Sequence, residues 1–377
     1  MTIDSAASAA PEKASLPTPH GRGLSVVIPT FNGFRLLEET LESVIAGVNG
    51  YRKETGAEAE IIVVDDGSTD GTEERLPERF PEVRVKKREV NGGFARACNS
   101  GIAEARFPLL ALLNNDVRIH RDYFIFHALH FNDPRVFAVT AKVFEWDRPI
   151  FTTGGRYASF RRGFWSVYYN YDRLLGKGQS WVESRRLLSF YAIGGFATFD
   201  REKLTVLGGF LELLSPFHWE DVDLSYRGWK RGWEIRYEPR SLAYHRTSAT
   251  IDRFYRSRFV ESVSFRNRLL FHWINLHNRR YLTEHLFWLA LLFLSRFAVL
   301  DFGFYRSLFG ALRRLPEALR LRKVEKKSAR RSDREIAEIL KSFYRLAPIE
   351  VYLSKRDVMN RHSESGLGQA ANQSIRS

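Results

Sequence analysis

The chain has 377 residues, and 58 Lys or Arg against 44 Asp or Glu give it a formal net charge of +14. This length allows one large domain or two ordinary ones, and the single cysteine, Cys98, excludes an internal disulfide and is typical of a reducing compartment. The positive charge fits nucleic acid, an anionic membrane surface or a polyphosphate ligand, and does not choose among them.

The two ends of the chain are predicted to be disordered. Residues 1–22 are polar, rich in Ala, Ser and Pro, and lack the apolar segment of a signal peptide, so we interpret them as a lead-in. Residues 362–377 are interpreted as a disordered tail. Between the ends, we expect an α/β domain over 23–250, with halves at 23–131 and 132–250, followed by a basic helical region over 251–361.

Strands and helices alternate through the first half. Asp70 is expected to cap the helix that follows the second strand. The helical spacing and the apolar runs predict strands at 24–29, 61–64, 83–85 and 109–113 and helices at 34–46 and 94–104. The alternation implies a parallel sheet with right-handed crossovers.

Polar side chains follow three of these strands at the point where each strand ends. Thr30 closes the first strand, Asp65 and Asp66 follow the second, and Asp116 follows the fourth. Turns favour Asp and Asn, so each residue alone would be weak support for a site. Because ligands of such sheets bind beyond the carboxyl ends of the strands, their convergence predicts a binding site.

The pattern changes after residue 132. An insert at 151–191 is rich in aromatic residues and arginine, and no motif assigns it a role. His245 closes the last predicted strand. Apolar runs and helical spacing predict strands at 136–143, 192–199, 235–237 and 242–244 and an amphipathic helix at 221–231.

The region after residue 250 lacks a strand pattern and is predicted to be helical. Its most apolar stretch, 286–300, is shorter than the roughly 20 residues of a spanning helix, so we interpret it as interfacial or core. Apolar and aromatic residues at 283–312 with positive flanks suit docking on anionic lipid; a hairpin packed on the catalytic domain, or a dimer interface, has the same pattern. Residues 313–345 carry twelve Lys or Arg against five Asp or Glu.

Five motifs in order carry a family resemblance over residues 24–246. They are Val-Val-Ile-Pro-Thr-Phe-Asn (26–32), Val-Val-Asp-Asp-Gly-Ser-Thr-Asp-Gly-Thr (63–72), Asn-Gly-Gly-Phe-Ala-Arg-Ala-Cys-Asn-Ser-Gly-Ile (91–102), Leu-Leu-Asn-Asn-Asp-Val (112–117) and Trp-Glu-Asp-Val-Asp-Leu (219–224). The chain resembles the family 2 glycosyltransferases, and among them the rhamnosyltransferase-like bacterial members that build cell-wall or surface polysaccharide. The resemblance implies the GT-A fold, an α/β architecture with a mixed, mostly parallel sheet flanked by helices, here with a helical C-terminal extension.

The resemblance implies a nucleotide-sugar donor site. Thr30 and Asp66 would hold a uracil or thymine base, and Asp65 would touch the base or the ribose. The glycine pair Gly194-Gly195 would let the backbone approach the donor, although a β-bulge would also need glycine. The full donor set comprises Pro29, Thr30, Asp65, Asp66, Asn91, Asn114, Asn115, Gly194 and Gly195.

A divalent metal, Mg²⁺ or Mn²⁺, is implied on the donor diphosphate. Asn114-Asn115-Asp116 corresponds to the family's Asp-x-Asp, so Asp116 would bind the metal, in keeping with the oxygen ligands of hard cations. Asn114 replaces the first carboxylate, which weakens the expected metal affinity. His245 is either a second metal ligand or an ordinary hydrogen-bonded histidine.

The acceptor side is implied at Trp219-Glu220-Asp221. Asp221 would be the general base that takes the acceptor hydroxyl proton in a single inverting displacement, and Glu220 would orient the acceptor. Trp219 would stack on a sugar ring. The two acids also suit the positive end of the helix that begins there, and the two roles are compatible. Asp223 is expected to be structural.

We therefore predict an inverting glycosyltransferase that moves a sugar from a UDP- or dTDP-linked donor to a glycan or polyprenyl-lipid-linked acceptor. The expected location is cytoplasmic, on the inner face of the plasma membrane, with homo-oligomerisation left open and no nucleic-acid partner. One alternative is a basic nucleic-acid-binding protein, for which no recognition motif is present. A sugar nucleotidylyltransferase would show a glycine-rich loop where 29–32 reads Pro-Thr-Phe-Asn.

Overall fold

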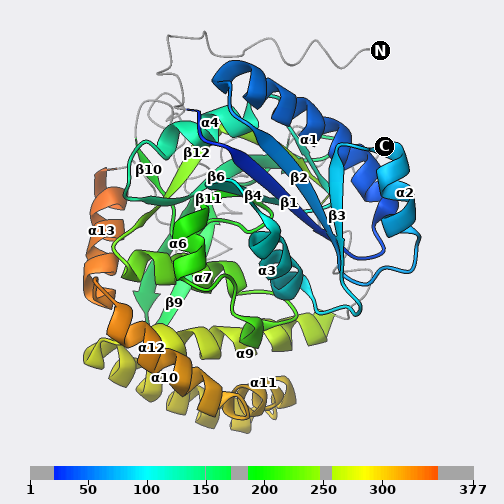
Figure 1. Cartoon of the computed structure of the whole chain (residues 1–377). Coiled ribbons are helices and arrows are strands. Elements are labelled where there is room, and N and C mark those ends of the chain that lie inside the picture. Colours follow the sequence, from blue (N-terminus) through cyan, green and yellow to red (C-terminus); the bar gives the residue numbers. More distant parts are fainter. Residues whose placement is uncertain (1–20, 149, 171–185, 247–256, 347–377) are drawn as a thin grey trace, which may run out of the picture.

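The computed structural model describes residues 21–148, 150–170, 186–246 and 257–346. A twisted central sheet lies between helices, and a group of C-terminal helices lies at one end of the molecule (Figure 1). Nearly all of the predicted lead-in, the whole predicted tail and part of the 151–191 insert fall outside the described residues.

The central sheet is mixed and mostly parallel, as predicted. β1, β2, β3 and β4 are parallel, whereas β11 is antiparallel to both neighbours, β4 and β6. β12 returns parallel to β6, and the short β5 and β7 pair with β12 and β6. The order is β10 (Leu187–Leu188), β12 (Glu234–His245), β6 (Val136–Glu145), β11 (Phe196–Asp200), β4 (Leu109–Leu113), β1 (Leu24–Thr30), β2 (Ala59–Asp65), β3 (Val83–Lys87), with β5 (Val117–Ile119) and β7 (Phe151–Thr153) off this path.

Both faces of the sheet are covered, which explains why its strands are apolar throughout rather than alternating. Along β1, Val26 and Ile28 enter one core, whereas Val27 between them enters the other. The first core holds α1 (Phe34–Thr55), α2 (Thr72–Arg79) and α4 (Tyr123–His130); the second holds α3 (Phe94–Glu104), α6 (Arg201–Val206) and α7 (Glu220–Lys230). A short 3₁₀ turn, η3 (Glu212–Leu214), leads towards α7.

Four local predictions differ from the structure. α1 continues past residue 46 because Val48 and Tyr51 keep its buried face apolar. The predicted strands at 235–237 and 242–244 are one strand, β12, whose register shifts between them. The strand expected over 192–199 begins only at Phe196. Gly71, not Asp70, occupies the cap position of α2; Asp70 instead accepts the backbone N–H of Phe34 (3.0 Å).

The insert and the C-terminal region form an interlocked unit. The insert supplies a hairpin, β8–β9, which forms a separate two-stranded sheet. α9, α11 and α12 share a third core through residues such as Leu270, Ile274 and Leu308. The elements of this unit are β8 (Arg156–Arg161), β9 (Phe164–Asn170), α9 (Ser257–Asn275), α10 (Arg279–Ala298), α11 (Phe302–Leu312), α12 (Leu315–Ser328) and α13 (Asp333–Leu346).

The last described helix, α13, packs back on the α/β domain. The Tyr344 hydroxyl of α13 donates to the carbonyl of Arg156 in β8 (2.9 Å). The buried carboxylate of Asp333 accepts from the Tyr226 hydroxyl (2.6 Å) and pairs with Lys230 (2.5 Å), both on α7. Within the described ranges, every helix is either too short or too polar to cross a lipid bilayer.

Candidate active site

The polar residues at the ends of β1, β2 and β4 come together as predicted. The side-chain amide of Asn115 donates to the Thr30 hydroxyl (2.9 Å), and the carbonyl of Asn115 accepts from Thr40 of α1 (2.9 Å). Asp65 accepts the backbone N–H of Ser68 (2.9 Å), which holds the turn after β2. Thr30, Asp65 and Asn115 are all buried. These contacts fix the edge of the sheet at which the donor site was expected.

Asp66 has several donors from within the chain. Its carboxylate accepts the backbone N–H groups of Gly92 (3.0 Å) and Gly93 (2.8 Å) and pairs with Arg88 Nε (2.7 Å). Asn91 lies in the same loop, where its side chain accepts from Gly93 (3.0 Å). Asp66 therefore shapes the loop that opens α3. Arg88 was missed from the sequence, where it reads as an ordinary basic residue after a strand.

Asp116 and His245 converge between β4 and β12. His245 Nε2 lies 3.2 Å from Asp116 Oδ1, and this buried oxygen has no hydrogen-bond donor among the described residues. The pairing of β12 with β5 sets His245 opposite Val117, next to Asp116 in the chain. An orphaned carboxylate oxygen beside an imidazole fits a divalent cation whose other ligands are phosphate and water. The described residues contain no cluster of three such side chains.

Gly194 and Gly195 lie between the two predicted halves of the site. The carbonyl of Gly195 accepts the backbone N–H of Asn114 (3.1 Å), and a Cβ on Gly195 would lie 2.4 Å from the Asn114 side chain. The backbone N–H of Gly194 lies near the carboxylate of Asp221 and opposes the rise in its pKa. The pair lies before β11, so it is not a bulge within that strand. The glycine pair therefore lies between the Asn114–Asp116 turn and the acidic first turn of α7.

Glu220 and Asp221 begin α7 as an interacting pair of acids. Burial, with the neighbouring charge of Asp221, raises the pKa of Glu220 to about 8. Burial also raises the pKa of Asp221 to about 6, although the backbone N–H of Val222 and the charge of Arg156 oppose this rise. Glu220 Oε2 is buried without a hydrogen-bond partner in the described part of the chain. Near neutral pH, Asp221 can be ionised while Glu220 keeps its proton, which separates their roles.

The loop before this pair has a strained backbone held by α9. His218 and Trp219 have φ values of 69° and 74°, which residues other than glycine rarely adopt. The amide of Asn267, fully buried on α9, donates to the carbonyls of Leu214, Phe217 (2.9 Å) and His218 (2.9 Å). Sequence analysis missed Asn267, because one asparagine in a helical region carries no local signal.

Trp219 and Asp223 are both tied to α9 as well. The Trp219 ring is half-buried and packs 5.3 Å from the ring of Phe271, which leaves only part of it for a sugar. Asp223 is fully buried between Arg227 (2.7 Å) and Asn275 (2.7 Å). This agrees with the structural role expected for Asp223.

Arg156 is a further residue that the sequence did not single out. It begins β8 in the 151–191 insert, and its charge acts on the carboxylate of Asp221 and on the hydroxyl of Tyr191. Its guanidinium lies 5.7 Å from the Tyr191 ring. The insert therefore contributes a cation and an aromatic ring beside the acidic pair, where an acceptor would lie.

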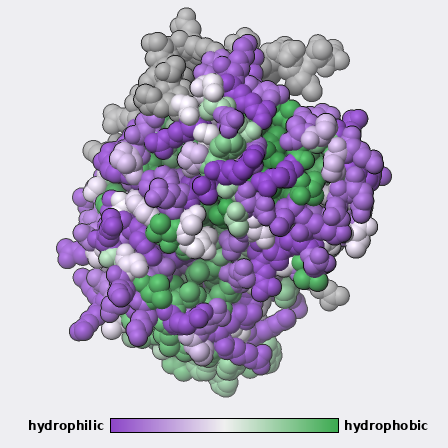
Figure 2. Space-filling model, in the orientation of Figure 1, coloured by the Kyte–Doolittle hydropathy of each residue, from purple (hydrophilic) through white to green (hydrophobic). Residues whose placement is uncertain are grey.

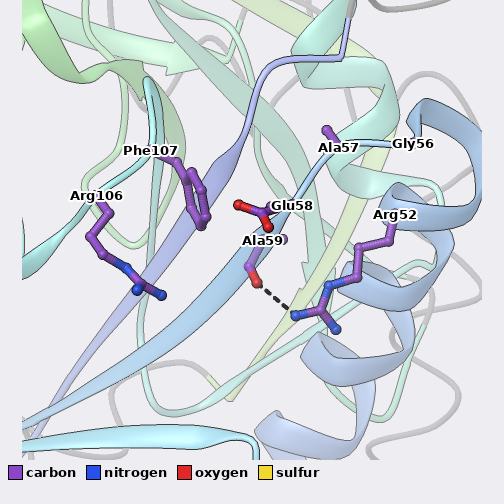
Figure 3. Close-up of a pocket in the computed structure, with 7 residues that line it drawn as sticks. All are labelled: Arg52, Gly56, Ala57, Glu58, Ala59, Arg106 and Phe107. Atoms are coloured by element: carbon purple, nitrogen blue, oxygen red, sulfur yellow. Dashed lines mark hydrogen bonds between the residues drawn. The ribbon is translucent and has the colours of Figure 1, made fainter.

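A separate pocket lies at the opposite ends of the strands and contains none of the predicted site residues. It is lined by Arg52, Ala59 and Phe107 among others, and the Arg52 guanidinium donates to the carbonyl of Ala59 (2.6 Å) at the start of β2 (Figure 3). Ligands of open α/β sheets bind at the carboxyl ends of the strands, so this pocket is not the donor site.

Comparisons with known proteins support the same family. The family model of glycosyl transferase family 2 matches residues 25–206. Over these residues the chain is similar to the family 2 glycosyltransferases. The poly-beta-1,6-N-acetyl-D-glucosamine synthase of Staphylococcus aureus strain COL is 25% identical over 253 residues, which cover 63% of this chain and 53% of that protein. The glycosyltransferase GlyG of Streptococcus pneumoniae serotype 4 is 35% identical over 96 residues, 25% of this chain and 30% of that protein.

The fold of the chain also matches solved structures. The crystal structure of GalNAc-T7 with UDP, GalNAc and Mn2+ aligns with a TM-score of 0.53 at 18% identity, over 68% of this chain and 48% of that one. This likeness confirms the predicted GT-A architecture. The chain spans about half the length of the synthases that it matches.

Proposed function

We propose that the chain transfers a sugar, with inversion, from a UDP- or dTDP-linked donor to a hydroxyl of a glycan or lipid-linked acceptor in cell-wall or surface polysaccharide synthesis. One observation carries the proposal. The carbonyl of Gly195 accepts from Asn114 on the diphosphate side, and the N–H of the adjacent Gly194 lies near Asp221 on the acceptor side, where it opposes the rise in the pKa of this acid. The two halves of a group-transfer site therefore meet at a glycine pair.

The donor is held at the strand ends. Pro29, Thr30, Asp65, Asp66 and Asn91 would surround the nucleoside, as the family resemblance implies. Asn114 and Asn115, with the glycine pair, would line the diphosphate. Asp116 and His245 would hold Mg²⁺ or Mn²⁺, and the solved structure of GalNAc-T7 contains UDP together with Mn2+. The metal would supply positive charge for the leaving diphosphate.

Asp221 acts as the base. Its carboxylate accepts the proton of the acceptor hydroxyl, whose oxygen attacks the anomeric carbon as the bond from that carbon to the diphosphate oxygen breaks. The raised pKa makes Asp221 a better proton acceptor while it stays ionised near neutral pH. Protonated Glu220 can donate a hydrogen bond to the acceptor, and half-buried Trp219 offers it an apolar edge.

Calorimetric titration with UDP, dTDP and GDP, with and without Mn²⁺, tests the donor site. We expect binding of a pyrimidine diphosphate that needs the metal and is lost in Asp116→Ala, whereas Asp147→Ala, which changes an exposed acid, binds normally. Asp221→Asn should keep this affinity and lose roughly 10²- to 10⁴-fold in turnover. A folded protein that binds none of the three nucleotides would contradict the proposal and favour a basic nucleic-acid-binding role.

A further inference from the structure

α10 is apolar on the side that packs and on the side that does not. Trp288, Leu289 and Leu292 pack on the core of α9, α11 and α12, and His285 is the one fully buried residue of the helix. The other side should be polar if it faced water alone. It is apolar instead, and its exposed residues are Leu286, Phe287, Leu291, Phe293, Leu294 and Phe297.

The exposed apolar side continues onto α11. Phe302 is 76% exposed and Phe309 is 55% exposed, and the hydrophobic surface at the lower end of Figure 2 lies where Figure 1 places α10 and α11. The charged residues between Leu286 and Leu312 are Arg296 and Asp301, which pair at 3.2 Å, and Arg306. We call this surface the α10–α11 face. An apolar surface of this extent normally has a partner.

A pocket of about 520 Å³ adjoins this face, between the β8–β9 hairpin and α10. Arg161, Arg162 and Arg268 line it, with Trp288 and Leu292 as its apolar wall, and no Asp or Glu is among its lining residues. Arg161 and Arg162 are exposed, and neither forms an ion pair with a described residue. Clustered guanidinium groups without a carboxylate favour a phosphate group.

The pocket and the face are fixed to each other. Gly163 at the hairpin turn has φ 74°, and a Cβ there would lie 2.7 Å from the backbone of Glu284 and His285. Its N–H donates to the Glu284 carboxylate (3.0 Å), and its carbonyl bonds to the His285 ring (2.8 Å). The arginines therefore lie beside the apolar helix in a single rigid unit.

We propose that the α10–α11 face docks on an anionic lipid bilayer and that the arginine pocket takes a lipid phosphate. A second copy of the chain would offer the same apolar face but would bring its own arginines against these, so charge complementarity favours lipid. Phosphate head groups above acyl chains match both parts of the unit. Arg268 also lies 5.7 Å from the Trp219 ring, so docking would turn the acceptor side towards the membrane. The docking itself does not depend on the proposed sugar transfer.

Vesicle flotation of the full chain tests the proposal. We expect binding to phosphatidylcholine vesicles that contain phosphatidylglycerol and weaker binding to phosphatidylcholine alone. Phe287→Glu with Leu294→Glu should lower the binding by roughly tenfold or more, because charge is costly below the head groups. Arg161→Gln with Arg162→Gln should lower it by roughly tenfold and remove the preference for anionic lipid. Val206→Glu, equally exposed on the distant α6, should bind like the wild type.

Three results would overturn the docking. Absent vesicle binding with a concentration-dependent dimer that Phe287→Glu abolishes would assign the face to a second copy. If the chain bound no vesicles and stayed monomeric, another part of the chain would cover the α10–α11 face. Equal binding by the double Glu variant and the wild type would place the contact elsewhere. Nucleotide titration of the same variants keeps this outcome separate from failure of the donor site.

Discussion

The two ends of the active site are built in different ways. The proposed donor side consists of short motifs at strand ends, which the pairing of neighbouring strands brings together. The proposed acceptor side depends instead on helices outside the sheet, as in the contacts of Asn267 on α9 with the loop at 214–218. Short sequence motifs are therefore enough to specify the donor side, whereas the acceptor side also needs the C-terminal helices in place.

Substitutions of two neighbouring glycines, Gly194 and Gly195, should affect nucleotide binding very differently. Gly195→Ala should weaken nucleotide binding by roughly 100-fold, because its Cβ would lie 2.4 Å from Asn114, a residue that cannot move without disturbing the turn to Asp116. Gly194→Ala is the matched control, since its Cβ would meet the rings of Phe94 (3.4 Å) and Phe210 (3.7 Å) at ordinary contact distances. Calorimetry of both variants measures the difference. Equal losses would show that the donor side is less tightly fitted than we infer.

A substitution on α9 should impair turnover without weakening nucleotide binding. Asn267→Ala removes the donor to three loop carbonyls, so we expect turnover to fall by roughly tenfold and stability by about 2 kcal/mol, with nucleotide affinity unchanged. Turnover, nucleotide titration and denaturant unfolding separate these effects. If nucleotide affinity fell in parallel with turnover, the loss would be a general one and Asn267 would not position the acceptor side.

The smallest expected effect concerns the pH dependence of stability. The fold raises the pKa of Glu220 from 4.5 to about 8, so its ionised form is disfavoured in the folded state. Wild-type stability is therefore lost as pH rises from the unfolded to the folded pKa, and Glu220→Gln should remove this loss. Urea unfolding should show the variant gaining on the wild type by about 1 to 3 kcal/mol between about pH 5 and about pH 9.

The exposed Glu78 provides the control for that measurement. Glu78→Gln on α2 should shift stability equally at both pH values. If the difference between Glu220→Gln and the wild type were also independent of pH, burial would not raise the pKa of Glu220 as we infer.

The sequence predicted which strand-end residues share one edge of the sheet, but not the residues that hold the loop before α7 or that lie beside Asp221. The convergence of Thr30, Asp65 and Asp116 was predictable because strand ends in a parallel sheet share an edge. His245 was expected near Asp116 only from the family resemblance, and the pairing of β12 with β5 brings the two residues together. Asn267 and Arg156 were not predictable, because each acts through a single hydrogen-bonding or charged group that lies neither in a motif nor at the end of a strand of the central sheet. Such contacts leave no periodic or motif signal.

Errors in the predicted elements have a similar origin. Residues 192–195 read as a strand because their apolar and glycine pattern continues into β11, yet the backbone there serves Asn114 and Asp221. β12 was divided in two because the polar residues around its register shift resemble a turn. In both places a functional or irregular backbone overrides a local preference.

The anchoring of α7 by Asp333 has a consequence for synthesis of the protein. Helix α7, which carries Asp221 in its first turn, ends at Lys230, and Lys230 pairs with a carboxylate about a hundred residues later. A nascent chain can form the strand-end motifs early, but α7 gains this partner only after α13 begins to leave the ribosome. The proposed nucleotide pocket should therefore form before α7 holds Asp221 in its final position. A ribosome-stalled chain that lacks α13 should bind nucleotide but show little sugar transfer.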